Sequence, residues 1–138
     1  MQERNGCYTY FLIVGKFDPV EISRKLNLKP EKSWKIGDKR RNGTRYDFAH
    51  FEVGRCDKYD PIVANQMLKT ISVVKDRVSI LKQIREENEV EFFLVVVPTI
   101  YAGGINPCLS PTLEIIDFCH ETRTQIDIDT YIYDSTDE

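Results

Sequence analysis

CYTYFLIVGKFDPVEISRKLN, residues 7–27, joins a strand pattern directly to a helix pattern. Residues 7–15 are rich in β-branched and aromatic side chains and end at Gly15, which predicts a strand near the centre of a sheet. Asp18 is a favourable N-cap residue and Pro19 suits the first position of a helix, so we expect a helix to begin here. The core-facing positions of this short helix are expected to be Val20, Ile22 and Leu26.

The next segment, SWKIGDKRRNGTRYDFAHFEVG (residues 33–54), predicts a β-hairpin. The pair Asn42-Gly43 favours a two-residue type I′ turn, because both central residues of that turn adopt positive φ. After the turn the side chains alternate, with Ala49, Phe51 and Val53 on one face and Tyr46, Phe48 and His50 on the other. Both faces carry aromatic bulk, so this strand is expected to be covered on both sides near its middle.

Residues 60–87 carry the longest helical pattern of the chain. Asp60-Pro61 repeats the combination of a cap and a proline, and the apolar periodicity continues to Glu87. A single helix over this segment would be about 40 Å long. Its buried stripe is expected to contain Leu68, Ile71, Val74, Val78 and Leu81, widened by Ile80 and Ile84.

A strand, a loop and a helix follow. EFFLVVVPT (residues 91–99) predicts a strand that is buried on both faces until Pro98 interrupts it. Residues 100–109 form a loop, and SPTLEIIDFCHETRT (residues 110–124) predicts a helix that begins at Ser110-Pro111. The buried side of this helix is expected to hold Leu113, Ile116 and the region of Cys119 and His120.

QIDIDTYIYD, residues 125–134, predicts a closing strand. Its inward positions are expected to be Ile126, Ile128 and Ile132, and its outward positions Asp127, Asp129, Tyr131 and Tyr133. Asp127 and Asp129 would then lie about 7 Å apart on one strand face, where paired carboxylates are weak candidates for a metal site. An ordinary strand with one solvent-exposed polar face would have the same alternating sequence, and the sequence indicates no third metal ligand.

The elements therefore alternate in the order β-α-β-β-α-β-α-β, in what we expect to be a single domain spanning residues 1–138. The first six match the ferredoxin-like βαββαβ pattern, with a helix and a strand added at the C-terminal end. We expect an α+β fold with an antiparallel or mixed sheet backed by two or three helices. Residues 134–138 are polar and are expected to form a short loose tail.

FLIVGKFDPVEISRKLNLKPEKSWKIGD, residues 11–38, resembles the opening of an uncharacterised bacterial family, domain-of-unknown-function family 4279. In that family an apolar strand leads into G-x-F-D-P-x-x-I-S-x-x-L-x-L-x-P and then a short basic strand followed by a glycine. LSPTLEIIDF (residues 109–118) and IDIDTYIY (residues 126–133) are similar to its C-terminal helix and final strand. The resemblance implies a small α+β domain without an established activity, and it supplies no catalytic residues.

Composition limits the classes of function. The formal net charge of −3 disfavours a dedicated nucleic-acid binder, which usually has an overall basic surface. No apolar run approaches the roughly 18 residues that a membrane helix needs. The N-terminal residues MQERNGCYTY lack the basic-then-apolar layout of a secretion signal, so a cytoplasmic location without membrane contact is expected.

The cysteines and histidines do not form a recognisable site. The four cysteines contain no C-x-x-C pair and the histidines are isolated, so free thiols are expected and zinc is not: Cys7, Cys56, Cys108, Cys119, His50 and His120. Cys119 and His120 point about 100° apart on a helix and do not form a nucleophile–base pair. His50, among aromatic residues, is expected to be packed and hydrogen-bonded. We expect no cofactor.

KRRNGTR, residues 39–45, is the strongest candidate for a binding site. In the predicted turn Arg41 faces Thr44 and Arg40 faces Arg45, so like charges oppose each other at some cost in stability. Three interpretations stay open: a solvated hairpin tip, a grip on an acidic protein partner, or a grip on nucleic acid or another phosphate ligand. The candidate binding residues are Trp34, Lys35, Lys39, Arg40, Arg41, Arg45 and Tyr46.

Together these features predict a non-enzymatic protein-interaction module, immunity-like or regulatory, that binds a partner with an acidic surface. Nucleic-acid or phosphate-ligand binding through residues 39–45 is the alternative. The loop after Tyr101 lacks the lysine and hydroxyl end of a phosphate-binding P-loop and is a weaker candidate. The oligomeric state is undecided, although an exposed edge strand could form a dimer.

Overall fold

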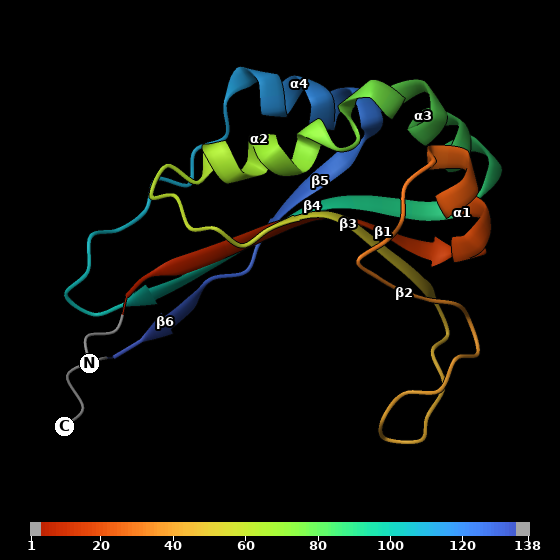
Figure 1. Cartoon of the computed structure of the whole chain (residues 1–138), viewed down its shortest axis with the longest axis horizontal. Helices are drawn as coiled ribbons and strands as arrows, with labels where there is room; N and C mark the ends of the chain where they lie inside the picture. Colours follow the sequence, from red (N-terminus) through yellow and green to blue (C-terminus); the bar gives the residue numbers. More distant parts are fainter. Residues whose placement is uncertain (1–3, 135–138) are drawn as a thin grey trace.

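The chain folds as one sheet with its helices packed on one face, in a computed structural model that describes residues 4–134 (Figure 1). The central strand β1 (Gly6–Lys16) runs antiparallel to β3 (Ala49–Cys56) on one side and to β4 (Glu89–Tyr101) on the other. The prediction of a central first strand is therefore confirmed, and so is the α+β class.

Three shorter strands complete the sheet at its margins. β2 (Lys32–Trp34) pairs with β3 in the antiparallel sense, while β5 (Thr124–Ile128) and β6 (Tyr131–Tyr133) both run parallel to β4. Within the described residues the strand order is β2-β3-β1-β4-β5. The ferredoxin-like relationship stays a prediction, and the expected loose tail lies outside the described residues except for Asp134.

The side chains of β1 alternate between the helices and an open face of the sheet that no helix covers. Phe11 and Ile13 are completely buried under the helices, whereas Tyr8, Tyr10 and Leu12 are half-buried on the open face. This period of two follows from the pleat of an extended strand. The open face is the surface on which the candidate site lies.

Helix α1 (Pro19–Leu26) begins where the sequence predicts, because the Asp18 carboxylate accepts a hydrogen bond of 3.0 Å from the Val20 N–H. Ile22 and Leu26 are buried, as expected. The prediction for Val20 is wrong, since that side chain is 73% exposed. Positions two apart on a helix lie on different faces, so Val20 and Ile22 cannot both face the core.

The expected 40 Å helix is wrong, because the segment bends. It forms α2 (Ala64–Ser72), a short 3₁₀ turn η1 (Lys75–Arg77) and α3 (Val78–Glu87). The Arg77 guanidinium braces the bend by donating to the carbonyl oxygens of Leu26 (2.5 Å) and Val73 (3.1 Å). The predicted stripe is nevertheless largely right, with Ile71, Val74, Leu81 and Ile84 buried and Leu68, Val78 and Ile80 partly buried.

The expected helix start at Asp60 is also wrong. Asp60 accepts hydrogen bonds from the Ile62 N–H and the Asn65 amide in a turn that precedes the helix. Helix α2 then begins at Ala64 with Val63 in the N-cap position. The buried face of its first turns holds Val63, Ala64 and Met67, which the sequence stripe omits.

Pro98 does not interrupt β4, which continues to Tyr101. The Val96 carbonyl accepts from the Asp129 N–H, so Pro98, two residues further on, directs its nitrogen to the same side. That side faces the gap between β5, which ends opposite Val96, and β6, which begins opposite Thr99. The missing N–H of proline therefore removes no bond of the sheet.

Helix α4 (Leu113–Thr122) begins after Thr112, whose hydroxyl accepts from the Ile115 N–H (3.4 Å), so the expected start at Ser110 is wrong. The predicted burial is confirmed for Cys119 and wrong for Leu113, Ile116 and His120. The buried residues are Ile115, Phe118, Cys119 and Thr122, while Leu113 and Ile116 are exposed. Adjacent apolar residues at 115 and 116 fit two phases equally, and only the packing distinguishes them.

The closing strand is divided at Asp129-Thr130 into β5 and β6. Ile126 packs against the core, but Ile128 (42% exposed) and Ile132 (76% exposed) do not, so their predicted burial is wrong. Both strands lie at the margin of the sheet beyond β4, where these side chains are open to solvent.

Candidate functional site

Residues 35–48 form an arm that leaves the sheet between β2 and β3 and projects away from the helices (Figure 1). Its tip is not the expected type I′ turn. Arg40 donates its N–H to the Thr44 carbonyl (2.7 Å) and accepts from the Gly43 N–H (3.1 Å), which closes a three-residue loop. Only Gly43 in this loop has positive φ (+87°). Such a loop needs the left-handed conformation at its last residue alone, and glycine occupies that place.

This turn changes the predicted register by one residue on one strand. Arg40 pairs with Thr44, and Lys39 forms the bridge with Arg45. The predicted pairings of Arg41 with Thr44 and of Arg40 with Arg45 are therefore wrong. Like charges still oppose each other across the arm, now as Lys39 and Arg45, and this costs stability.

The base of the arm is a stack of three rings, which we call the aromatic ladder: His50, Trp34 and Tyr46. The ring centroids of Trp34 lie 3.9 Å from those of His50 and 4.0 Å from those of Tyr46, with interplanar angles of 16° in both pairs. The Arg40 guanidinium lies over the Tyr46 ring at 4.5 Å, and the Trp34 indole N–H donates to the Phe48 carbonyl (3.1 Å). The rings therefore hold the arm in place, and both faces of the indole are occupied.

A buried polar pair anchors the ladder to the sheet. The His50 Nε2 lies 2.6 Å from the Glu52 carboxylate, and the two residues are only 8% and 7% exposed. The expectation of a packed, hydrogen-bonded histidine is confirmed. A buried carboxylate is costly unless it is paired. The contact with Glu52 is therefore maintained, and it holds the imidazole ring of His50 in its place in the ladder.

A cavity of about 530 Å³ lies beside the ladder and is lined by Lys32, Arg40, Arg41, Asn42 and Tyr46. Three cations and no carboxylate line it. The Nε atom of Arg40 is buried there and has no hydrogen-bond partner among residues 4–134. Sequence reasoning missed Lys32, although its alternation with Trp34 on one strand would have indicated that the two share a face.

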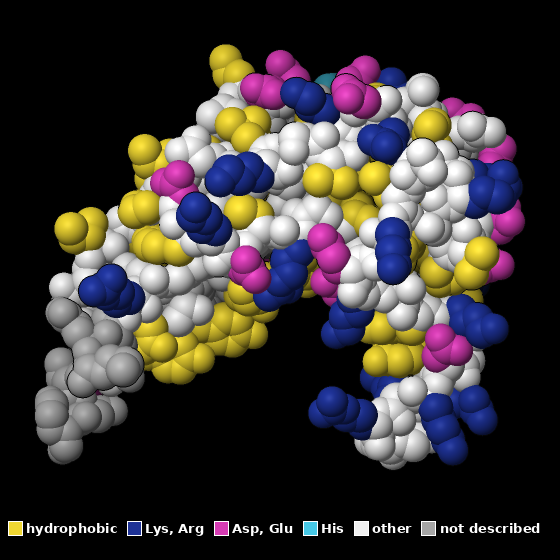
Figure 2. Space-filling view, in the orientation of Figure 1, with side chains coloured by type: hydrophobic (Ala, Val, Ile, Leu, Met, Phe, Trp, Pro, Cys, Tyr) yellow, Lys and Arg dark blue, Asp and Glu magenta, His cyan; other side chains and the backbone are white. Residues whose placement is uncertain are grey.

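The six cations of residues 32–46 have no carboxylate partner in the part of the chain that the structure describes. Only Arg45 makes a side-chain hydrogen bond, to the Gly37 carbonyl (2.8 Å). The single acid of this segment, Asp38, accepts from the Lys35 backbone N–H instead. Figure 2 shows these Lys and Arg side chains gathered at the lower right of the molecule.

The charge of the molecule is therefore unevenly distributed. Residues 32–46 contain six Lys or Arg and one Asp, a formal charge of +5, in a chain whose formal charge is −3. All other residues together carry −8. The arm is a positive projection on a negative body, which the whole-chain sum conceals.

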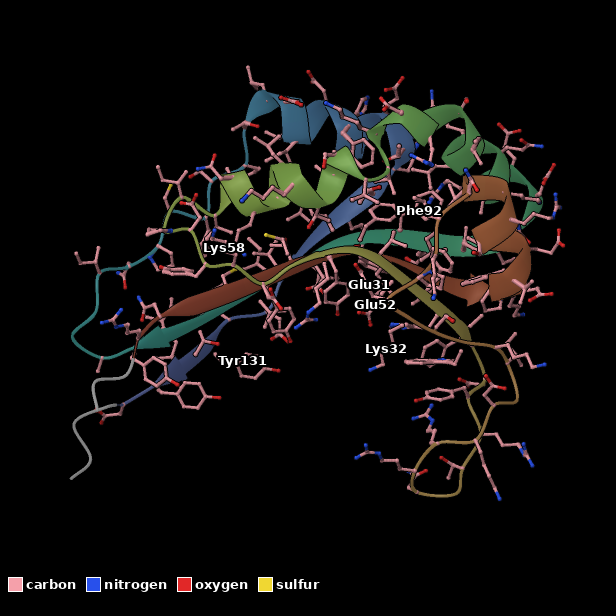
Figure 3. All side chains as sticks on the ribbon, in the orientation of Figure 1. Glu31, Lys32, Glu52, Lys58, Phe92 and Tyr131 are labelled. Carbon is pink, nitrogen blue, oxygen red and sulfur yellow. The ribbon has the colours of Figure 1, made fainter. Side chains whose placement is uncertain are left out.

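The open face of the sheet is hollowed between the arm and β6 (Figure 2). Lys32 points into this hollow from β2 and Tyr131 from β6, and Glu52 lies next to Lys32 (Figure 3). The Arg55 guanidinium lies 4.1 Å above the Tyr8 ring. Burial, aided by the charge of Glu52, raises the pKa of Tyr10 to about 12, so its hydroxyl remains a neutral hydrogen-bonding group on this face.

Among the described residues, the structure brings no third metal-ligating side chain to Asp127 and Asp129. The Asp129 carboxylate accepts from the Tyr131 hydroxyl (3.3 Å), and the strand breaks directly after it. Within residues 4–134, no group of three or more His, Cys, Asp or Glu side chains is positioned to hold a metal ion.

Two of the thiols, Cys7 and Cys119, are buried, and hydrogen bonds hold the loop after Tyr101. All four cysteines are free, and burial raises the pKa of Cys7 and of Cys119 to about 11. Cys119 is buried and His120 exposed, as their helical spacing requires. The Asn5 amide fixes the loop after Tyr101 by donating to the Ile105 carbonyl and accepting from the Tyr101 N–H, both at 2.8 Å.

Comparison with known proteins identifies the family. The model of a domain of unknown function, DUF4279, matches residues 5–133, so the chain belongs to this family and the predicted resemblance is confirmed. No curated protein and no solved structure matches the chain. Among the helices of residues 4–134, none has the length and apolar character needed to cross a membrane.

Proposed function

We propose that this member of the DUF4279 family is a non-enzymatic interaction module whose arm binds an acidic surface of a partner protein. The observation that carries the proposal is that the six cations of residues 32–46, five of them in the arm and the sixth at Lys32 of β2, have no carboxylate partner among the described residues. Lys39 and Arg45 even oppose each other. Carboxylates from a partner would relieve that repulsion and form charge-assisted hydrogen bonds.

The aromatic ladder supports this function because it orders the arm before any partner arrives. Arg40 is held over Tyr46 with its Nε atom already buried. A guanidinium fixed in this way loses little conformational freedom on binding a carboxylate, and such preorganisation increases affinity.

Two observations favour a protein partner over nucleic acid. The residues outside 32–46 carry a formal charge of −8, which repels a long polyanion. Unstacked bases need exposed aromatic faces, whereas both faces of the Trp34 indole are covered by His50 and Tyr46. A regulatory or immunity-like role in the bacterial cytoplasm belongs to this proposal.

A phosphate-bearing ligand is the second candidate. The cavity of about 530 Å³ gathers Lys32, Arg40 and Arg41 around one space, and that arrangement also suits phosphate oxygens. The two candidates share the same residues and differ in the ligand, so one experiment distinguishes them.

The experiment compares Arg40, Arg41 and Arg45 all changed to Ala with a matched control in which Lys29, Lys58 and Lys75 are changed to Ala. The control removes the same charge from exposed positions outside the arm. Fluorescence anisotropy with a labelled poly-glutamate peptide and with single-stranded DNA is the readout. The proposal expects the arm variant, and not the control, to lose peptide affinity by tenfold or more.

Preferential binding of DNA would instead support the phosphate candidate. Loss of three phosphate contacts should then reduce the log–log salt slope by about 2, since each contributes roughly 0.7 on a single strand. If wild type, arm variant and control bind the peptide with the same affinity, and also bind DNA with the same affinity, the arm is a solvated hairpin. If instead the arm binds the peptide, capture from a native lysate followed by mass spectrometry would identify its natural partner.

A further inference from the structure

The outer flank of α4 carries two exposed apolar side chains, with the exposed His120 one turn further along the same stripe. Leu113 is 77% and Ile116 is 44% exposed, and the two are neighbours one turn apart. Glu121, about 140° around the helix from Ile116, contacts Lys82 of α3 (3.5 Å). The flank with Ile116 therefore faces away from α3, toward the margin of the sheet at β5, where Ile128 is also exposed (42%).

Strand β5 ends the sheet with an unpaired edge. The Asp129 N–H donates to the Val96 carbonyl of β4, so the alternate residues Gln125 and Asp127 direct their backbone groups to β4 as well. The N–H and C=O groups of Thr124, Ile126 and Ile128 then point outward, where the described residues offer no strand to receive them. The strand contains no lysine or proline, the residues that commonly protect such an edge.

We propose that this margin binds a second copy of the chain, with the two β5 strands antiparallel about a two-fold axis at Ile126. Ile126 of each copy would exchange both N–H···O=C bonds with its counterpart, because its backbone groups point outward. Thr124 would pair with Ile128 of the second copy. This register uses the whole five-residue strand and leaves none of its outward groups unpaired.

Charge selects this register. Gln125 of each copy lies opposite Asp127 of the other copy. The side-chain amide of Gln125 can therefore donate a hydrogen bond to the Asp127 carboxylate at both places. An axis one residue later would place Asp127 opposite itself, which like charges disfavour. An axis one residue earlier would require strand pairing at Arg123, which ends α4 with φ of +60° and lies outside the strand.

The apolar flank accounts for a second copy rather than an isolated peptide strand. An antiparallel β5 pair places the two α4 helices beside the axis on the same face of the joined sheet. Ile116 and Ile128 of both copies then lie beside this axis, so one isologous contact covers the strand edges and these side chains. A peptide strand alone would leave the α4 flank in water.

Sedimentation equilibrium across a concentration series tests the proposal. Wild type should show a mass that rises from one to two chains. Gln125→Lys should tighten the dimer roughly fivefold, because a lysine then faces Asp127 on both sides of the axis. Gln125→Lys combined with Asp127→Lys should weaken it by a similar factor, since lysines then face each other.

The controls separate this contact from other effects. Gln125 donates to Glu91 within one chain (3.3 Å), and lysine keeps that contact favourable, so unfolding curves should confirm that each variant is folded. Asp127→Lys alone, with a lysine facing neutral Gln125, should dimerise about as well as wild type. The arm variant should keep its dimer, because the arm lies at the opposite margin of the sheet.

Two results would overturn the proposal. One is the mass of a single chain at every concentration. The other is a dimer whose affinity ignores the charges at 125 and 127, which would place the contact on a different surface. Ile116→Glu, at an exposed position, should also weaken the dimer if the α4 flanks meet.

Discussion

The indole ring of Trp34 lies parallel to the imidazole ring of His50, with their centroids 3.9 Å apart. The two residues are cross-strand partners on β2 and β3, so the stack forms only when those strands pair in register. Tyr46, within the arm, covers the other side of the indole at 4.0 Å. Trp34 therefore joins the arm to the sheet, and the position of the arm cations depends on it.

Replacing Trp34 with Ala should loosen the arm. The substitution removes two ring stacks and the hydrogen bond to the Phe48 carbonyl, and for a half-buried side chain we expect a loss of about 2 kcal/mol in the free energy of unfolding. Hydrogen exchange at the Gly37 and Tyr46 amides, which bond across the base of the arm, should accelerate. Trp34→Phe, which keeps an aromatic ring, should show a smaller change. Unaltered exchange at both amides in Trp34→Ala would contradict this role.

Gly15→Ala should destabilise the protein by about 3 kcal/mol or more. Gly15 has φ of +144°, and a Cβ atom there would collide with the Glu89 carbonyl oxygen and approach the Val90 Cα at 2.8 Å. Gly6→Ala in the same strand is the matched control, because nothing lies within 4 Å of its Cβ position and its loss should be well under half as large. Chemical denaturation measures both, and similar midpoints would refute the prediction.

Stability should fall as the pH rises from about 9 to 11. Burial raises the pKa of the Cys7 and Cys119 thiols to about 11 from 9.0, so over this window the unfolded chain loses protons that the native state retains. By linkage the free energy of unfolding then decreases with pH, and the contribution is fully present below pH 9. Denaturation midpoints measured across this range for wild type and for Cys7→Ala with Cys119→Ala provide the test. The variant should decline less steeply, and an equal decline would contradict the assignment.

The order of the elements could be predicted from the sequence because local chemistry encodes it. The cap and proline at Asp18 and Pro19, and the aromatic and β-branched run of β1, act within a few residues of themselves. The bend between α2 and α3 could not be predicted, since it is braced by Arg77 on the distant Leu26 carbonyl. Ile115 and Ile116 are both apolar, and only the packing of the helix decides which of them is buried.

The same distinction applies to the candidate site. The arm cations were identified from their density in the sequence, because charge is a property of composition. The aromatic ladder depends on the register of Trp34 with His50, and the cavity depends on the fold that places Lys32 and Arg40 around one space. Because the ladder and the cavity form only in the tertiary structure, the sequence indicated the cations but not the aromatic stack that holds the arm in place.

The central position of β1 has a consequence for how the chain acquires its structure during synthesis. Its partners in β4 lie far along the chain, with Gly6 paired to Thr99 and Lys16 to Glu89. At the usual pace of translation, β1 waits roughly 5 to 20 s for that neighbour to be made. Pairings of such long range close slowly, so the contact order of this fold is high and its rate of folding is expected to be limited by the arrival of β4. During that interval the edge of β1 that will pair with β4 has no partner strand, although β3 can already pair with its other edge.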